Sequence, residues 1–267
     1  MPDTGRVAGI LAEAAAEEVM PRFRNLASGD VHEKSPGELV TAADEAMERR
    51  LAPALRALIP GSMVVGEEGA AADPAVLSLL EGDEPVWLVD PLDGTANFAA
   101  GLPVFGVMVC LVVRAEPVAA WIHDPMSKGT LMAEAGSGAW LDGVRIRLKP
   151  AVRDPLTASI STRFFPAGLR EAWEAASSTF ENRGPSRCAA RTYLELATGE
   201  LDVAMYYRLL PWDHAPGVLI HREAGGFATR LNGQPYSPLV HSGGVFAGPD
   251  EEVWRRIAPL FEGLPTP

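Results

Sequence analysis

The stretch that decides the fold reads Trp87-Leu88-Val89-Asp90-Pro91-Leu92-Asp93-Gly94-Thr95-Ala96-Asn97-Phe98. Its apolar first part is short, continuous and bounded by turn residues, which predicts a buried strand. Asp90 and Asp93 follow at the carboxyl end of that strand, where open α/β sheets bind ligands. Hard divalent cations such as Mg²⁺ prefer carboxylates and other oxygen ligands. The stretch therefore predicts a strand that ends in a metal site.

The turn after this strand adds an anion site. Pro91 fixes its own φ, and Gly94 permits a backbone conformation closed to other residues, so the two carboxylates and the Leu92 carbonyl can converge on one point. The backbone N–H groups of Gly94 and Thr95 are then free to face an anion. Ordinary turn chemistry explains one Asp before a Gly, but it has no use for a second acid and an adjacent Thr. We therefore expect a phosphate group beside the metal.

The hexapeptide Asp90-Pro-Leu-Asp-Gly-Thr resembles the first signature of the inositol monophosphatase family. These are lithium-sensitive, Mg²⁺-dependent phosphomonoesterases related to fructose-1,6-bisphosphatase. Three more segments, residues 34–44, 64–69 and 211–226, are similar to the family in the expected order, and with flanking similarity they cover nearly all of the chain. The resemblance implies a five-layer αβαβα sandwich, with the site between the halves and usually a homodimer.

Two of these segments imply further metal ligands. Glu67 follows a short apolar run and would bridge metals and help to activate the attacking water; a solvated acidic loop is the alternative for this segment alone. Asp213 opens a predicted helix, where the helix dipole favours a carboxylate, and a simple N-cap is its alternative. The resemblance implies a first Mg²⁺ on Glu67, Asp90 and the Leu92 carbonyl, a second on Asp90, Asp93 and Asp213, and a third, weaker ion near Glu67.

Residues 34–44 resemble a family segment in which Asp44 would hold the Thr95 hydroxyl, so that this hydroxyl orients the nucleophilic water. Locally, Thr41 or Asp44 also makes a good N-cap for the helix that follows, and both roles can hold together. Glu38 departs from the family, which usually has an Asp there. The catalytic set implied by the resemblance is Glu67, Thr95 and Asp44.

The reaction predicted from these residues is metal-assisted hydrolysis of a small phosphate monoester. A bound Mg²⁺ lowers the pKa of water, and phosphoryl transfer depends mostly on positioning and charge neutralisation. Asp93 and the Gly94 and Thr95 amides would steady the phosphoryl group, and no side-chain nucleophile is needed. Further expectations from the resemblance are Mn²⁺ as a substitute metal and inhibition by Li⁺ and Ca²⁺.

The predicted substrate pocket departs from the inositol-specific members of the family. Those members place a Glu, which binds sugar hydroxyls, where this chain has Tyr206, with Arg208 nearby. We therefore expect weak preference for inositol monophosphate and an aromatic or more anionic leaving group. The substrate residues implied are Gly94, Thr95, Asp93, Arg187, Ala189, Tyr206, Arg208 and His214. 3′-Phosphoadenosine 5′-phosphate and histidinol phosphate remain open as substrates, as does a non-catalytic binding or regulatory role.

Composition limits the partners. The chain has 267 residues, of which 47% are hydrophobic and 22% charged, and these globular values exclude disorder. The formal net charge of −12, from 23 basic and 35 acidic residues, argues against nucleic acid as a partner. Cys110 and Cys188 form no disulfide framework or metal-ligand spacing. Without a signal peptide or an apolar run of membrane-spanning length, we expect a cytoplasmic protein and no membrane partner.

Periodicity predicts an α+β first half, residues 1–150, and an α/β second half, residues 151–267. In the first half, helices over 4–27 and 44–58 accompany one large antiparallel sheet with strands near 62–66, 85–90, 104–114, 117–123, 130–133, 138–141 and 144–148. The second half alternates strands at 158–162, 202–207 and 245–249 with helices at 168–180, 193–198 and 213–224 and a last helix from 250. The overall class expected is α/β.

Overall fold

Two large β-sheets organise the part of the chain that the computed structural model describes, residues 2–148, 154–176 and 180–261. The first has seven strands in the order β3 (Met63–Gly66), β4 (Val86–Asp93), β5 (Gly106–Val113), β6 (Glu116–His123), β7 (Thr130–Glu134), β8 (Gly138–Leu141) and β9 (Val144–Ile146). The second has five in the order β11 (Phe180–Asn182), β10 (Leu156–Ile160), β12 (Val203–Tyr206), β14 (Val245–Gly248) and β13 (Phe227–Arg230). A separate hairpin joins β1 (Val31–Ser35) to β2 (Glu38–Thr41).

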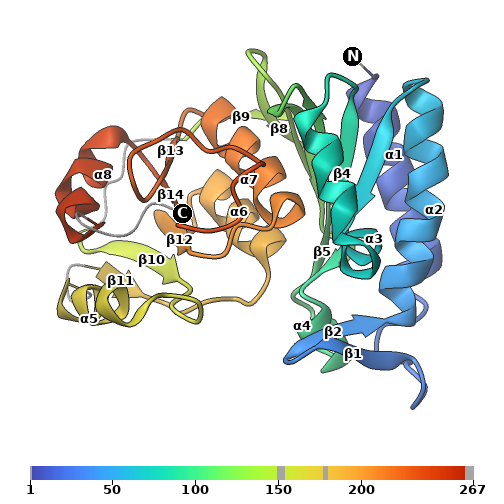
Figure 1. Ribbon diagram of the computed structural model, residues 1–267, viewed down its shortest axis with the longest axis horizontal. Helices are drawn as coiled ribbons and strands as arrows, with labels where there is room; N and C mark the ends of the chain where they lie inside the picture. The colour runs from blue at the N-terminus through green and yellow to red at the C-terminus, as the bar shows by residue number, and fades with distance from the viewer. Residues whose placement is uncertain (1, 149–153, 177–179, 262–267) are drawn as a thin grey trace.

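Helices cover both sheets and fill the space between them (Figure 1). On the outer face of the seven-stranded sheet lie α1 (Thr4–Ala14), continued by a π-helical segment (Ala15–Val19), and α2 (Ala42–Leu58). Between the two sheets lie α6 (Ala189–Thr198) and α7 (Pro211–Glu223). The far face of the second sheet packs against α5 (Ala167–Ala176) and α8 (Glu251–Ile257). This is the five-layer αβαβα arrangement expected for the chain.

Three hydrophobic cores separate these five layers. Alternate residues of β4 show the pattern: Trp87 and Val89 face α1 and α2, whereas Val86 and Leu88 face α6 and α7. All four side chains are buried, which explains why the strand reads as a continuous apolar run and not as an alternation. The third core lies between the five-stranded sheet and its outer helices and includes Trp173, Phe246 and Trp254.

Strand register brings the predicted ligands together. β3 and β4 are parallel and Gly66 pairs with Val89, so the residues that follow, Glu67 and Asp90, leave the same edge of the sheet side by side. Glu67 begins a short helix, α3 (Glu67–Ala72). After Asp93, Gly94 adopts a left-handed conformation with φ of 88° and caps α4 (Thr95–Ala99). The turn therefore needs its glycine.

Several predicted elements differ from the structure. The first helix is α-helical only to Ala14 and ends, after its π-helical segment, near residue 20 and not at 27. The first sheet is not wholly antiparallel, because β3 pairs with β4 in parallel. Sequence patterns did not predict β1, β2, β11, β13, α3 and α4, all of which have six residues or fewer.

Other differences concern boundaries. α6 begins at Ala189, four residues before the predicted start, and β10 lies two residues earlier than expected. The predicted boundary at residue 150 and the last residues of the helix predicted over 168–180 lie outside the described residues, so the division into two halves stays a prediction. None of the helices described is both long and apolar enough to cross a membrane.

Candidate metal and phosphate site

Three carboxylates from distant segments converge on one point. Glu67 comes from the start of α3, Asp90 from β4 and Asp213 from the first turn of α7, and one oxygen of each lies within 4.8 Å of the others. Asp90 is 1% exposed, whereas Glu67 and Asp213 are partly exposed where they line a cavity. The structure thus brings together three of the predicted metal ligands.

The electrostatics of this cluster favour a cation. Burial raises the pKa of Asp90 well above its usual value, and the neighbouring Glu67 and Asp93 carboxylates raise it further. Burial and the same two neighbours also raise the pKa of Asp213. A group of mutually repelling oxygen ligands that is open to a cavity is the donor set that a hard divalent cation such as Mg²⁺ uses. The residues therefore fit the metal that the sequence predicts.

Asp93 and the Leu92 carbonyl lie beside this cluster. Asp93 lines the same cavity, and its Oδ2 accepts hydrogen bonds from the Ala190 amide at 2.6 Å and the Cys188 thiol at 3.0 Å. Burial raises the pKa of Asp93 to about 6 although these donors act in the opposite direction. The Leu92 carbonyl oxygen is 3.0 Å from the Thr95 hydroxyl. One Asp93 oxygen is thus engaged by the first turn of α6.

Asp44 is placed where the sequence analysis expects it. It is fully buried, and its Oδ1 lies 2.9 Å from the Thr95 hydroxyl. Its other oxygen accepts the Thr41 amide at 2.8 Å, so that Thr41 and Asp44 form a capping box at the start of α2. Burial raises the pKa of Asp44 to about 6 against these hydrogen bonds. The N-cap and the contact with Thr95 coexist.

A lysine that also lines the cavity pairs with Glu67. Lys34 Nζ is 2.7 Å from both Glu67 Oε1 and Glu68 Oε1. Burial alone would lower the pKa of Lys34, but the two carboxylates outweigh it and the net change is upward. Glu48 accepts the Glu68 and Gly69 amides at 2.9 Å and 2.8 Å and so fixes the first turn of α3. The roles of Glu48 and Glu68 were missed, because each contact joins segments far apart in the sequence.

The cavity above the carboxylates has a volume of about 510 Å³. Arg208 forms an ion pair with Glu38 of the β1–β2 hairpin, and its guanidinium lies over the Phe164 ring at 4.4 Å from the centroid. The predicted substrate residues that line the cavity are Asp93, Gly94, Thr95, Arg187, Ala189, Tyr206 and Arg208. Arg163 and Phe164, which also line it, were not predicted, since they lie in a loop without a recognisable pattern.

His214 was predicted either to touch the substrate or to lie behind residues that do, and the structure places it behind a residue of the cavity wall. His214 is buried and lies outside the residues that line the cavity, where it packs behind Tyr206 with a ring-centroid distance of 4.6 Å. Its Nε2 lies 3.1 Å from the Arg208 carbonyl oxygen, which can only accept, so Nδ1 accepts from the Tyr193 hydroxyl at 3.2 Å. Burial lowers the pKa of His214 to about 3. One step along α7 turns the side chain away from the site.

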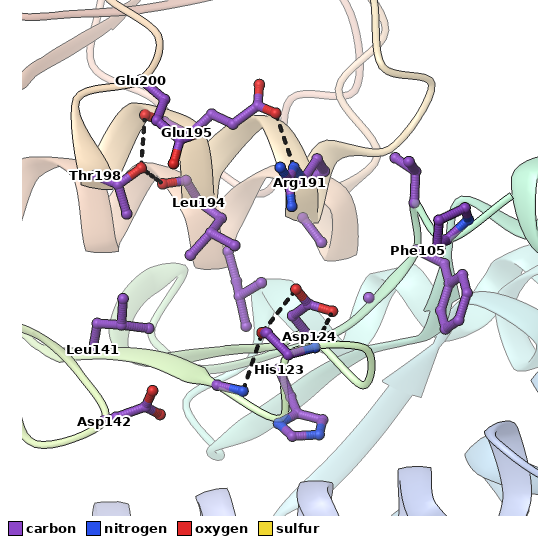
Figure 2. Close-up of a pocket in the computed structure, with 17 residues that line it drawn as sticks. Phe105, His123, Asp124, Leu141, Asp142, Arg191, Leu194, Glu195, Thr198 and Glu200 are labelled. Carbon is purple, nitrogen blue, oxygen red and sulfur yellow. Dashed lines mark hydrogen bonds and ion pairs between the residues drawn. The ribbon is translucent and has the colours of Figure 1, made fainter.

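A second cavity, of about 210 Å³, lies between α6 and the ends of β6, β7 and β8. Figure 2 shows the Arg191–Glu195 ion pair of α6 on one side of this cavity and Asp124 and Asp142 on the other. None of the residues predicted for the site lines it. The predicted chemistry is therefore confined to the larger cavity.

Comparison with known proteins agrees with this geometry. The model of the inositol monophosphatase family matches residues 5–264. The chain belongs to the inositol monophosphatase family. It is 32% identical to a chloroplastic phosphatase, IMPL1, of Arabidopsis thaliana over 97% of this chain and 71% of that protein. It is 30% identical to the Nus factor SuhB of Vibrio cholerae over 88% of this chain and 87% of that one.

The fold agrees as well. An inositol monophosphatase of Thermotoga maritima superimposes with a TM-score of 0.79 over 96% of this chain and 95% of that chain, at 24% sequence identity. The mixed α/β architecture predicted from the sequence is thereby confirmed. This member of the family is a phosphatase, a hydrolase of phosphoric monoesters, and its acidic cluster could bind a metal.

Proposed function

We propose that this inositol monophosphatase family member hydrolyses a small phosphate monoester with Mg²⁺, two or three ions per site, and a water molecule as the nucleophile. The observation that carries the proposal is the convergence of Glu67, Asp90 and Asp213 to within 4.8 Å, next to a threonine hydroxyl that a buried aspartate holds. A structural role for these carboxylates would leave their mutual repulsion uncompensated.

The protein would hold the ions through the carboxylates and one carbonyl. Glu67, Asp90 and the Leu92 carbonyl form the first ligand set of the proposal, and Asp90, Asp93 and Asp213 the second. When bound, Mg²⁺ would lower the pKa of water and neutralise charge on the phosphoryl oxygens. Asp93 would contribute the oxygen that α6 leaves free, because its Oδ2 already accepts from Ala190 and Cys188.

Thr95 would position the attacking water. Its hydroxyl has one proton and two acceptors within reach, Asp44 Oδ1 at 2.9 Å and the Leu92 carbonyl at 3.0 Å. Once that proton is donated, the hydroxyl oxygen can only accept a hydrogen bond, which orients the water with its own oxygen toward the phosphorus. Gly94 and Thr95 open α4, and the first amides of a helix lack intrahelical acceptors, so they can bind phosphoryl oxygens.

The leaving group would lie against Tyr206, Arg208, Arg187 and Ala189. Tyr206 stands where the inositol-specific members have a Glu, and its phenol lacks the carboxylate oxygens that accept from sugar hydroxyls. We therefore propose weak preference for inositol monophosphate. Rates on inositol 1-phosphate, histidinol phosphate and 3′-phosphoadenosine 5′-phosphate test this point, and a clear inositol preference would contradict it.

Hydrolysis of p-nitrophenyl phosphate with and without Mg²⁺ tests the reaction itself. We expect Mg²⁺-dependent release that Asp93→Asn abolishes, while the matched change Asp83→Asn has no effect because Asp83 is exposed in the loop before β4 and does not line the cavity. No rate above the blank in the parent chain would support the second candidate, a regulatory binding role. The relatives named Nus factor SuhB are the observation in favour of that role.

Two further features remain predictions. The homodimer rests on the family resemblance, and cytoplasmic localisation rests on the sequence. Sedimentation velocity at micromolar concentration would test the dimer: a single species near 28.4 kDa, the mass of one chain, would contradict it.

A further inference from the structure

Three arginines and a phenylalanine line the same cavity as the carboxylates. Arg163 and Phe164 follow β10, Arg187 precedes α6 and Arg208 precedes α7. Phe164 is 39% exposed, and two guanidinium groups stack on its ring, with the Cζ atoms of Arg208 and Arg163 at 4.4 Å and 5.0 Å from the centroid. Stacking orients a planar guanidinium while its N–H edge stays available for an anion.

Arg163 and Arg187 differ from Arg208, which pairs with Glu38. Among the residues that the structure describes, no carboxylate lies within ion-pair distance of Arg163 or Arg187. Arg187 is exposed and has a φ of 59°, a left-handed conformation that costs a residue with a side chain about 1–2 kcal/mol. The backbone thus carries a cost at the position that presents this guanidinium to the cavity.

Charge in the cavity is unbalanced once the phosphoryl group is bound. Four cations, Lys34, Arg163, Arg187 and Arg208, and five carboxylates, Glu38, Glu67, Asp90, Asp93 and Asp213, line it, for a net charge of −1. Two divalent ions would change this charge to about +3, and a phosphate monoester dianion would reduce it to about +1. A substrate with one more anionic group would complete the neutralisation.

The wall of the cavity formed by Arg163, Arg187 and Arg208 offers a neutral polyol no free carboxylate among the described residues. Glu38 is the acid that pairs with Arg208: one of its oxygens accepts from Arg208 and the other accepts the Ser35 hydroxyl at 2.8 Å. Sugar hydroxyls are usually held by acceptors of this kind, whereas guanidinium groups prefer carboxylates and phosphates. The wall is therefore built for an anion.

We propose that Arg163, Arg187 and Arg208 form a subsite for a second anionic group, so that the preferred substrate is a phosphate monoester whose alcohol carries a further phosphate or carboxylate. This inference rests on the proposed function, because it assigns the leaving-group side of the same cavity. It also explains why Tyr206 stands where the inositol-specific members have a Glu.

Matched substrate pairs test the subsite in the full chain with Mg²⁺. Glucose 1,6-bisphosphate against glucose 1-phosphate isolates a second phosphate, and 2-phosphoglycerate against glycerol 2-phosphate isolates a carboxylate. We expect kcat/KM to be about tenfold higher for the anionic member of at least one pair, the value of one charge-assisted contact. Arg163→Gln and Arg187→Gln should each lower that ratio about threefold or more.

Arg114→Gln is the matched control. Arg114 is an exposed arginine with a φ of 52° in the turn between β5 and β6. It pairs with Asp83 and does not line the cavity. This change should leave the ratio as in the parent. The subsite is overturned if the parent's kcat/KM is no higher for the anionic member of either pair. It is also overturned if neither Arg163→Gln nor Arg187→Gln changes the ratio of the two kcat/KM values.

Equilibrium binding separates this inference from the proposed function. Isothermal titration of the same pairs with Ca²⁺ in place of Mg²⁺ should show about tenfold tighter binding of an anionic member, and Arg187→Gln should weaken it. If the parent binds in this way but hydrolyses no ester, the proposed function fails and the subsite stands. If esters are hydrolysed but both members of each pair bind equally, the subsite alone fails.

Discussion

Asp213→Asn should stabilise the metal-free protein while removing its response to Mg²⁺. The oxygens of Glu67, Asp90 and Asp213 lie within 4.8 Å of one another, and two unit charges at that distance repel by about 3.5 kcal/mol at an effective dielectric constant of about 20. Proton uptake relieves part of this repulsion, because the pKa of Asp90 and that of Asp213 are both raised by burial. Removing one charge should therefore raise the free energy of unfolding by about 1–3 kcal/mol.

Thermal unfolding with EDTA and with Mg²⁺ measures both effects. Without metal, Asp213→Asn should raise the Tm by about 2–8 °C for a chain of this size. Mg²⁺ at about one hundred times its Kd should stabilise the parent by about 2.7 kcal/mol, and the variant much less. The control Asp83→Asn alters a side chain that is 87% exposed and should stay within about 0.5 kcal/mol of the parent. A variant less stable than the parent in EDTA, or one that gains as much from Mg²⁺, would refute the reasoning.

Three other outcomes follow from single contacts. Burial lowers the pKa of His221 to about 4. The unfolded chain therefore takes up a proton near pH 6.5, whereas the folded chain does so only near pH 4. The free energy of unfolding should fall by about 3 kcal/mol as the pH is lowered through this window. His221→Gln should flatten the difference in urea melts between pH 7 and pH 4.5, and an unchanged slope would contradict this. Thr95→Val should lower kcat by about tenfold or more while calorimetry shows that Mg²⁺ still binds. Thr95→Ser keeps the hydroxyl and should keep most of the rate. Equal rates for the two variants would show that Thr95 has no part in the reaction. A double-mutant cycle on Glu38 and Arg208 should give a coupling below about 1 kcal/mol, because the two side chains are 29% and 37% exposed, and a larger value would show a stronger link between hairpin and second sheet.

The part of the site that the sequence predicted lies where strands end. Val86 to Val89 read as a buried strand and Met63 to Val65 as another, but an antiparallel sheet was expected, whereas the parallel pairing of these two strands is what places Asp90 and Glu67 side by side. The contact between Thr95 and Asp44 spans 51 positions and followed only from the family resemblance, since no local pattern specifies it. Local patterns predicted the two strands and their terminal carboxylates, and the family resemblance supplied how these residues meet.

The elements that were missed have weak local signals. The β1–β2 hairpin contains His32, Glu33, Lys34 and Ser35, which show no apolar alternation because this two-stranded sheet covers little core. α6 starts earlier than predicted because Cys188 is its N-cap and accepts the Arg191 amide through sulfur, and cysteine is not among the usual capping residues. In both cases tertiary contacts supply what the local sequence does not.

The residues proposed for the reaction and those proposed for substrate choice lie in different parts of this fold. The metal ligands lie at ends of β4 and at the starts of α3 and α7, elements packed between buried layers, so their positions are fixed by the same cores that set the fold. Arg163 and Arg187 lie on connecting segments, where a substitution changes charge without disturbing a core. Because core positions leave periodic patterns and loop positions leave none, the sequence predicts the hydrolysis of a phosphate ester more firmly than it predicts the alcohol. The arginines of the wall therefore share no sequence pattern and come together only in the cavity that they line.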